Sequence, residues 1–181
     1  LIDEKKNIII NADKISYLKN EEKIIANGDV QLEDKNKNII INTDQISYLK
    51  SKEHIFANGN VWLEDKSKDI NINADEISYL KNEEKVFAIG NVKLVDKNKN
   101  IIIKTDEISY LKNKEKIFAK GDVKLEDKTK DIFVNANQIS YLKNEGKIVA
   151  DGNVVLIDKS KDITINTIKI TYLKNINKIY S

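Results

Sequence analysis

Apolar and polar residues alternate along most of this chain with a period of two, the pattern of β-strands that bury one face. In residues 23–33 the even-numbered positions hold Ile, Ala, Gly, Val and Leu, and the odd-numbered positions are mostly polar. Residues 8–12 and 15–17 alternate in the same way, but the parity slips between Ala12 and Ile15. The pattern therefore predicts two long β-arms, one of which contains an irregularity.

The same alternation returns at a fixed spacing of thirty-one residues. The spacing is marked by Tyr17, Tyr48, Tyr79, Tyr110, Tyr141 and Tyr172 and by Gly28, Gly59, Gly90, Gly121 and Gly152. A fixed period of this length predicts an array in which each unit buries its apolar face against its neighbours. We expect residues 1–181 to form a single repeat domain of about six 31-residue units. Because the chain begins in mid-unit at Leu1, we also expect it to be a fragment or the mature part of a longer protein.

Polar tetrads separate the arms and predict four-residue hairpin loops at Lys19–Glu22 and Asp34–Lys37. Antiparallel pairing must set inward-facing residues opposite one another, and both loops meet this condition. The expected pairs are Tyr17 with Ile24 and Ile15 with Ala26 at the first loop, and Leu32 with Ile39, Val30 with Ile41 and Gly28 with Thr43 at the second.

Each arm is expected to bend midway. The parity slip predicts an extra residue, a β-bulge, near Asp13–Lys14, and Gly28 lies beside it on the other arm. A hairpin turn at Asn27–Gly28 is the competing interpretation, but the equivalent pair Ile89–Gly90 would force isoleucine to a positive φ. We therefore predict an all-β fold, a folded-over antiparallel β-solenoid with the section of a V-shaped β-jellyroll.

Composition and charge narrow the function. With 40% hydrophobic and 33% charged residues, the chain is too apolar for disorder. The net charge is only +2 and no basic face is evident, so we do not expect nucleic acid as a partner. Cysteine is absent, which excludes disulfides. No nucleophile, acid pair or metal cluster departs from the repeat pattern, so we predict neither an enzyme nor a cofactor.

Three repeated or singular features invite other interpretations. The row Asp34, Asp65, Asp96, Asp127 and Asp158 resembles a metal column, but each is followed by lysine, and we interpret the row as solvated turns. His54 occupies a slot that is lysine in other units and is expected to be solvated. The outward row of Phe56, Phe87 and Phe118 predicts an exposed apolar stripe that either shields the sheet or docks a partner.

Two phrases of the repeat resemble a known family. The segments Ile10-Asn11-Ala12-Asp13-Lys14-Ile15-Ser16-Tyr17-Leu18 and Ala26-Asn27-Gly28-Asp29-Val30-Gln31-Leu32 are similar to the signatures of the OstA/LptA-type lipopolysaccharide-transport family. That family includes a periplasmic bridge protein and the amino-terminal domain of its outer-membrane barrel partner. The resemblance covers the whole chain, five to six times over, although the last unit departs from it at Ile168.

The resemblance implies periplasmic transport of lipopolysaccharide or a similar amphiphile in a Gram-negative bacterium, bridging towards the outer membrane. Acyl chains would lie between the two sheets and the polar head outside the open mouth of the V. The residues expected to line this lumen are Ile10, Ile15, Ile24, Val30, Leu32, Ile41, Ile46, Ile55, Val61, Leu63, Ile72, Ile77, Val86, Val92, Leu94, Ile103, Ile108, Ile117, Val123, Leu125, Ile139, Ile148, Val154 and Leu156.

A second function class stays open on the residues alone. If the inward rows interdigitate fully, the chain is a structural spacer, an adhesin stalk or a designed repeat with a dry, packed core. In either case both terminal strands present unpaired backbone groups without a protecting proline. We therefore expect the rod to extend by strand addition, to itself or to related β-jellyroll transport proteins.

Overall fold

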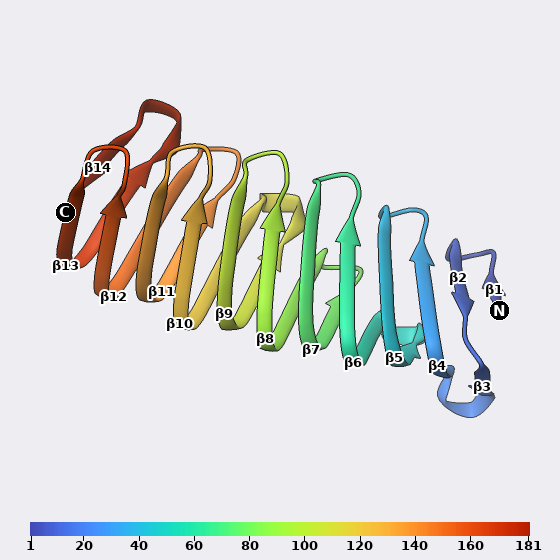
Figure 1. The fold of residues 1–181 in the computed structure, drawn as a ribbon. Helices are drawn as coiled ribbons and strands as arrows, with labels where there is room; N and C mark the ends of the chain where they lie inside the picture. Colours follow the sequence, from blue (N-terminus) through green and yellow to red (C-terminus); the bar gives the residue numbers. More distant parts are fainter.

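The computed structural model describes all 181 residues as a rod of antiparallel strands joined by short loops (Figure 1). The strands are β1 (Ile2–Asp3), β2 (Ile8–Asn11), β3 (Lys14–Leu18), β4 (Lys23–Asp34), β5 (Ile39–Leu49), β6 (His54–Asp65), β7 (Ile70–Leu80), β8 (Lys85–Asp96), β9 (Ile101–Leu111), β10 (Lys116–Asp127), β11 (Ile132–Leu142), β12 (Lys147–Asp158), β13 (Ile163–Leu173) and β14 (Lys178–Tyr180). Single 3₁₀ turns lie at η1 (Lys19–Glu21), η2 (Lys50–Lys52), η3 (Lys112–Lys114) and η4 (Lys174–Ile176).

The strands form one 14-stranded sheet in which each long strand pairs with its neighbours in the sequence. β2 and β3 both pair with β4, one with each end of it, so they are the two parts of a single interrupted arm. The sheet folds over along its length, and Figure 1 shows the resulting two layers of strands. The predicted fold class, a folded-over antiparallel β-solenoid, is confirmed.

The two layers are halves of the same strands. We call the half that ends at the aspartate row the Asp half; Val30–Asp34 and Ile39–Thr43 belong to it. We call the other half, which ends at the Tyr-Leu-Lys loops, the Tyr half; Lys23–Asn27 and Gln45–Leu49 belong to it. Inward residues of both halves form one cluster of 42 buried hydrophobic residues that runs through the rod.

The first predicted loop is confirmed and the second is displaced by one residue. Tyr17 pairs with Ile24 across Lys19–Glu22, as expected. β4 extends to Asp34, however, so the second loop is Lys35–Asn38, and the predicted pairs across it are wrong. The observed pairs are Leu32 with Ile41 and Val30 with Thr43. The inward parity is unchanged, because the register moves by two residues.

Local hydrogen bonding explains the displaced loop. The Asp34 carboxylate accepts the backbone N–H of Lys37 at 3.2 Å, which keeps Asp34 at the end of the strand. Asn38 closes the loop with φ of 54°, a left-handed conformation that asparagine tolerates. The turn is therefore organised around the aspartate rather than beginning with it.

The corner lies at the glycine row, but the extra residue is on the glycine arm and not near Asp13–Lys14 as predicted. β4 has 12 residues and β5 has 11, and their register shifts between Asn27 and Val30. Gly28 and Asp29 both have positive φ, at 78° and 41°. Glycine is required because a Cβ on Gly28 would lie 2.4 Å from the carboxylate of Asp13.

The terminal strands are partial and cover different halves. β1 pairs with β2 through Ile2 and Asp3, in the Asp half. β14 pairs with the last residues of β13, in the Tyr half. No helix in the structure has the length and apolarity to cross a bilayer.

Candidate binding interior and the seam that closes it

The predicted lumen residues lie where the sequence placed them, facing inward from both halves. All of them except Ile15 are at most 2% exposed, and Ile15 is half-buried against the same cluster. Two further rows that the alternation also turned inward are buried with them, the tyrosines from Tyr48 to Tyr172 and the isoleucines from Ile8 to Ile132. The interior is an apolar column, and in this state its own side chains fill it.

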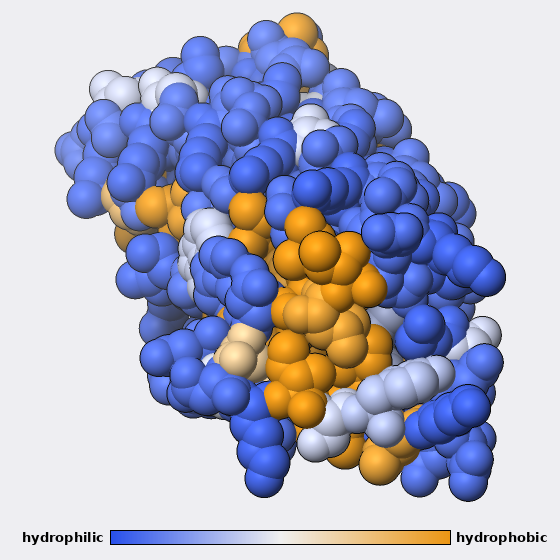
Figure 2. Space-filling view, turned by 90° about the vertical axis from the view of Figure 1, so that its right-hand side faces the viewer, coloured by the Kyte–Doolittle hydropathy of each residue, from blue (hydrophilic) through white to orange (hydrophobic).

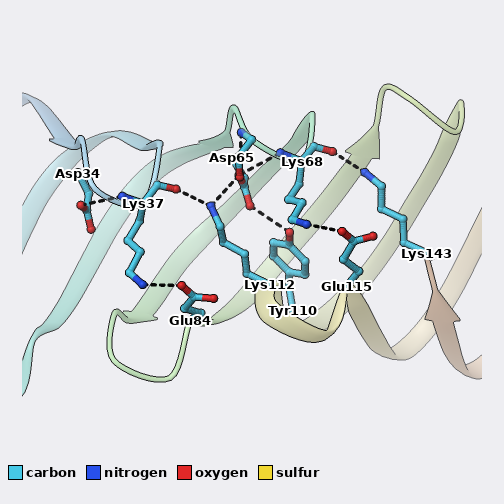
Figure 3. Close-up of polar contacts among 10 residues, drawn as sticks. Asp34, Lys37, Asp65, Lys68, Glu84, Tyr110, Lys112, Glu115 and Lys143 are labelled. Atoms are coloured by element: carbon cyan, nitrogen blue, oxygen red, sulfur yellow. Dashed lines mark hydrogen bonds and ion pairs between the residues drawn. The ribbon is translucent and has the colours of Figure 1, made fainter.

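The open mouth expected for the V is not present, because the tips of the two halves meet. From Asp3 to Asp127, each aspartate at the tip of the Asp half pairs with a lysine at the tip of the Tyr half, three strands further along the sheet. Figure 3 shows this contact at Asp65, which also meets a tyrosine. We call this row of contacts the polar seam. It consists of inner rungs built on the aspartates and outer rungs built on loop lysines.

The inner rungs are buried ion pairs. Asp65 accepts hydrogen bonds from Lys112 Nζ at 2.9 Å and from Tyr110 Oη at 3.0 Å. The remaining pairs repeat the same spacing of 47 residues and are Asp3 with Lys50, Asp34 with Lys81, Asp96 with Lys143 and Asp127 with Lys174. The prediction that these aspartates are solvated turns is wrong: Asp34, Asp65, Asp96 and Asp127 are 0% exposed.

Burial of the inner rungs changes their protonation behaviour. Burial, followed by the neighbouring carboxylates, raises the pKa of Tyr48, Tyr79, Tyr110, Tyr141 and Tyr172 well above the usual tyrosine value. At the first rung, burial raises the pKa of the Asp3 carboxyl, but the bond to Lys50 and its charge outweigh that effect and leave the pKa lowered. The bond to Asp3 likewise raises the pKa of Lys50.

The outer rungs connect the loops of the two halves nearer to solvent. Lys6 pairs with Glu53, Lys37 with Glu84 and Lys68 with Glu115, each again 47 residues apart. Lysines of the inner rungs also donate to loop carbonyls: Lys112 to Lys37 and Lys143 to Lys68 (Figure 3). These contacts tie loops that the sheet itself does not connect.

The ends of the rod lack a facing half and expose part of the core. Figure 2, which faces the N-terminal end, shows an apolar band between hydrophilic flanks. Tyr17 is 48% exposed there, and a hollow of about 470 Å³ is lined by residues that include Tyr17, Ile24 and Lys50. At the other end, Ile163 is 42% exposed. The exposure follows from the three-strand offset, because a terminal tip has no partner across the seam.

Two other predicted features lie outside this interior. His54 is half-buried at the start of β6, with a ring nitrogen 2.7 Å from Ser78 Oγ. Phe56 and Phe118 are each 39% exposed on the outer face of the Tyr half, and a hollow of about 240 Å³ is lined by Phe118 and Phe87 among others. The predicted exposed stripe is therefore present.

The seam is what inspection of the sequence missed. Its signal was present within the chain, because the aspartate row and the lysine after each Tyr-Leu do not vary from unit to unit, whereas the second and third residues of those loops change. A solvated turn does not require such constancy. The pairing partners were hidden because they lie one and a half repeats apart.

Comparison with known proteins supports the fold. The sequence matches no protein-family model and no curated protein. The fold is similar to the crystal structure of LptH from Pseudomonas aeruginosa, described as the LptA-homologous periplasmic component of the conserved lipopolysaccharide transport device. The similarity has a TM-score of 0.58 at 16% identity and covers 66% of this chain and 85% of LptH.

Proposed function

We propose that this chain carries lipopolysaccharide or a similar amphiphile, with the acyl chains against the aliphatic interior and the polar head outside the seam. The observation that carries the proposal is the interior itself, an uninterrupted apolar column between two halves that are joined covalently along only one edge. The similarity of the fold to LptH supports the same function. By the same analogy, we place the chain in the periplasm of a Gram-negative bacterium, bridging towards the outer membrane.

Acyl chains can enter only if the two halves move apart. The interior residues are fully buried in one another, so a bound chain must replace contacts that they now make among themselves. The replacement exchanges one apolar surface for another, and its free-energy cost is small compared with exposing the same surface to water. Loading therefore requires the two halves to lie further apart than they do when their own side chains fill the interior.

Photo-crosslinking from the two faces of one strand tests the proposal. A photoreactive residue at Ile77, which is 1% exposed and faces the interior, should capture purified lipopolysaccharide. The matched control is Ser78, the next residue of β7, which faces outward. Equal capture from both positions, or none from Ile77 in a folded variant, would contradict a loaded interior.

The alternative function is that of a structural spacer with a permanently packed core. The filled interior favours it, because a rod needs no lumen. The two functions predict opposite outcomes at Ile77: a spacer captures no lipid and its thermal unfolding midpoint does not change when lipopolysaccharide is added.

We further propose that the ends dock copies of this chain or related β-jellyroll proteins. Among residues 1–181, Asp158 has no lysine across the seam and Lys19 has no aspartate. Asp158 instead pairs with Lys161 of its own loop at 2.7 Å; this bond, with that from Ser160, lowers the pKa of the Asp158 carboxyl. Head-to-tail stacking would bring Lys19 to Asp158 and continue the spacing of the other rungs.

Sedimentation velocity over a wide concentration range measures this docking. We expect species that grow with concentration, since a heterologous interface need not close. Replacing Lys19 with glutamate should weaken the assembly. The same change at Lys14, an exposed residue at the start of β3, should have little effect. A monomer at all concentrations would exclude the interface.

A further inference from the structure

The two halves of the rod meet along two edges, the corner at the glycine row and the polar seam, and different contacts hold them together at each edge. At the corner, the halves are continuous strands. At the seam, they are held by side chains alone, and the inner rungs are charged groups placed at the rim of an apolar core. If the halves ever part, they must part at the seam.

The chemistry of the inner rungs suits a contact that opens. A buried ion pair recovers little free energy beyond the cost of removing its charges from water, and well-packed apolar residues often close such a site more stably. When the seam opens, Asp65 and Lys112 regain their hydration, which offsets the contact they lose. Isoleucine or leucine at the same tips would make opening far more costly, since their surface would become exposed.

The outer rungs are not uniform along the rod. Lys6, Lys37 and Lys68 each have a glutamate opposite, but the next positions in the same register are Gly146 opposite Lys99 and Asn177 opposite Lys130. The seam therefore has double rungs towards the N-terminus and single rungs over the C-terminal units. Glycine at position 146 is not required by the backbone, since glutamates at the equivalent positions 84 and 115 adopt φ of 50° and 47°.

We infer that the polar seam is a reversible closure over the interior, and that it opens first over the C-terminal units, where the outer rung is missing. This inference rests on the proposed function, because it names the route by which acyl chains reach the interior. The lysine–aspartate pairs of the inner rungs repeat along the rod, and the tyrosine hydroxyl adds a hydrogen bond only at Asp65, Asp96 and Asp127. The outer rungs set how readily each segment opens.

Thiol labelling measures opening without any ligand, and the chain contains no cysteine to interfere. Ile39→Cys lies between two double rungs, and Ile101→Cys lies between two single rungs; both native side chains are 0% exposed. We expect the Ile101→Cys variant to react faster with a small maleimide than the Ile39→Cys variant. Amide hydrogen exchange on the same samples should show both flanking strands still protected, which separates seam opening from unfolding.

Two reciprocal substitutions then add an outer rung where it is missing and remove one where it is present. Gly146→Glu in the Ile101→Cys background should slow labelling roughly two- to fivefold, and Glu84→Gln in the Ile39→Cys background should accelerate it by a similar factor, the range expected for one partly exposed ion pair. Equal labelling rates at both cysteines, or rates that Gly146→Glu and Glu84→Gln leave unchanged, would overturn the closure. If Gly146→Glu fails to fold, Glu84→Gln alone still tests the dependence.

A covalent lock connects the closure to loading. Lys99→Cys and Gly146→Cys, joined across the seam by a short bismaleimide, should strongly reduce capture of purified lipopolysaccharide from a photoreactive group at Ile77. The matched control joins Lys68→Cys to Lys99→Cys, two loops on the same side of the seam, and should capture normally. Undiminished capture by the locked protein would overturn the seam as the route while leaving the proposed function intact. Rung-dependent labelling without capture in any variant would overturn the proposed function and leave the closure standing.

Discussion

The corner and the seam are the two long edges of the same folded sheet, and they are built on opposite principles. The corner is backbone: Gly28 and Asp29 adopt positive φ and the Asp13 N–H donates to the Gly28 carbonyl at 3.0 Å. The seam is side chain, with every rung joining residues of strands that are not neighbours in the sheet. The backbone geometry of the corner is therefore the same in every unit, whereas the strength of the seam depends on which side chains form each rung.

Alkaline pH should have the largest effect, and it acts on the seam. The five buried tyrosines have raised pKa values and stay neutral in the folded chain, whereas unfolded tyrosine ionises near pH 10. Their contribution to stability is complete below about pH 10 and falls as the pH rises further, because only the unfolded state then loses protons.

At pH 11 the loss is about 1.4 kcal/mol for each tyrosine. Urea midpoints between pH 8 and pH 11 measure it, and absorbance at 295 nm should report tyrosinate from the five buried side chains only as the protein unfolds. Tyr110→Phe should reduce the pH dependence by about a fifth, because it removes one of the five buried tyrosines. Reversible ionisation of all seven tyrosines near pH 10 in a folded chain would contradict the prediction.

Removing one partner of an inner rung should be the next largest effect. Asp65→Ala leaves the buried Lys112 ammonium without its counter-ion and the Tyr110 hydroxyl without its acceptor, and we expect a loss of about 3–5 kcal/mol in the free energy of unfolding. The control replaces the whole rung with apolar residues, Asp65→Leu, Lys112→Met and Tyr110→Phe. Its stability should lie within about 1–2 kcal/mol of the native value. If the triple variant loses as much free energy of unfolding as Asp65→Ala, the inner rungs stabilise the fold strongly. That result would contradict a seam that opens reversibly.

A substitution at the corner should have a smaller effect. Gly90 has φ of 79°, and a Cβ there would lie 2.3 Å from Asp75 Oδ2 and 2.9 Å from Asp75 Cβ. Gly90→Ala should cost about 2–3 kcal/mol in chemical denaturation. Gly146→Ala, at φ of 61° in a loop, meets only the flexible Asn175 side chain and should cost about 1 kcal/mol. Similar losses of stability for Gly90→Ala and Gly146→Ala would show that the contact between the added Cβ and Asp75 costs little.

Much of the fold was accessible from the sequence because its causes are local or periodic. The thirty-one-residue spacing, the period-two alternation and the small residues near Gly28 predicted the strands, the inward face and the corner. The first loop, at Lys19–Glu22, followed from matching faces across it. The second loop was misplaced by one residue because matching faces left two registers equally acceptable. The bond from Lys37 N–H to Asp34 decides between them.

By itself, then, the sequence determined a repeating β-rod with an aliphatic inward face, since side-chain alternation and repeat length need no knowledge of distant contacts. Only the tertiary structure decided that the rod is closed. The seam depends on how far the fold offsets one half against the other, and that offset brings Asp65 to Tyr110 and Lys112, three strands away. The offset depends on how each strand turns at the corner, where the register shifts between Asn27 and Val30, and the alternation of apolar and polar residues does not specify that turn. For the same reason the row of aspartates, interpreted from the sequence as solvated turns, is in the folded chain the buried half of an ion-pair ladder.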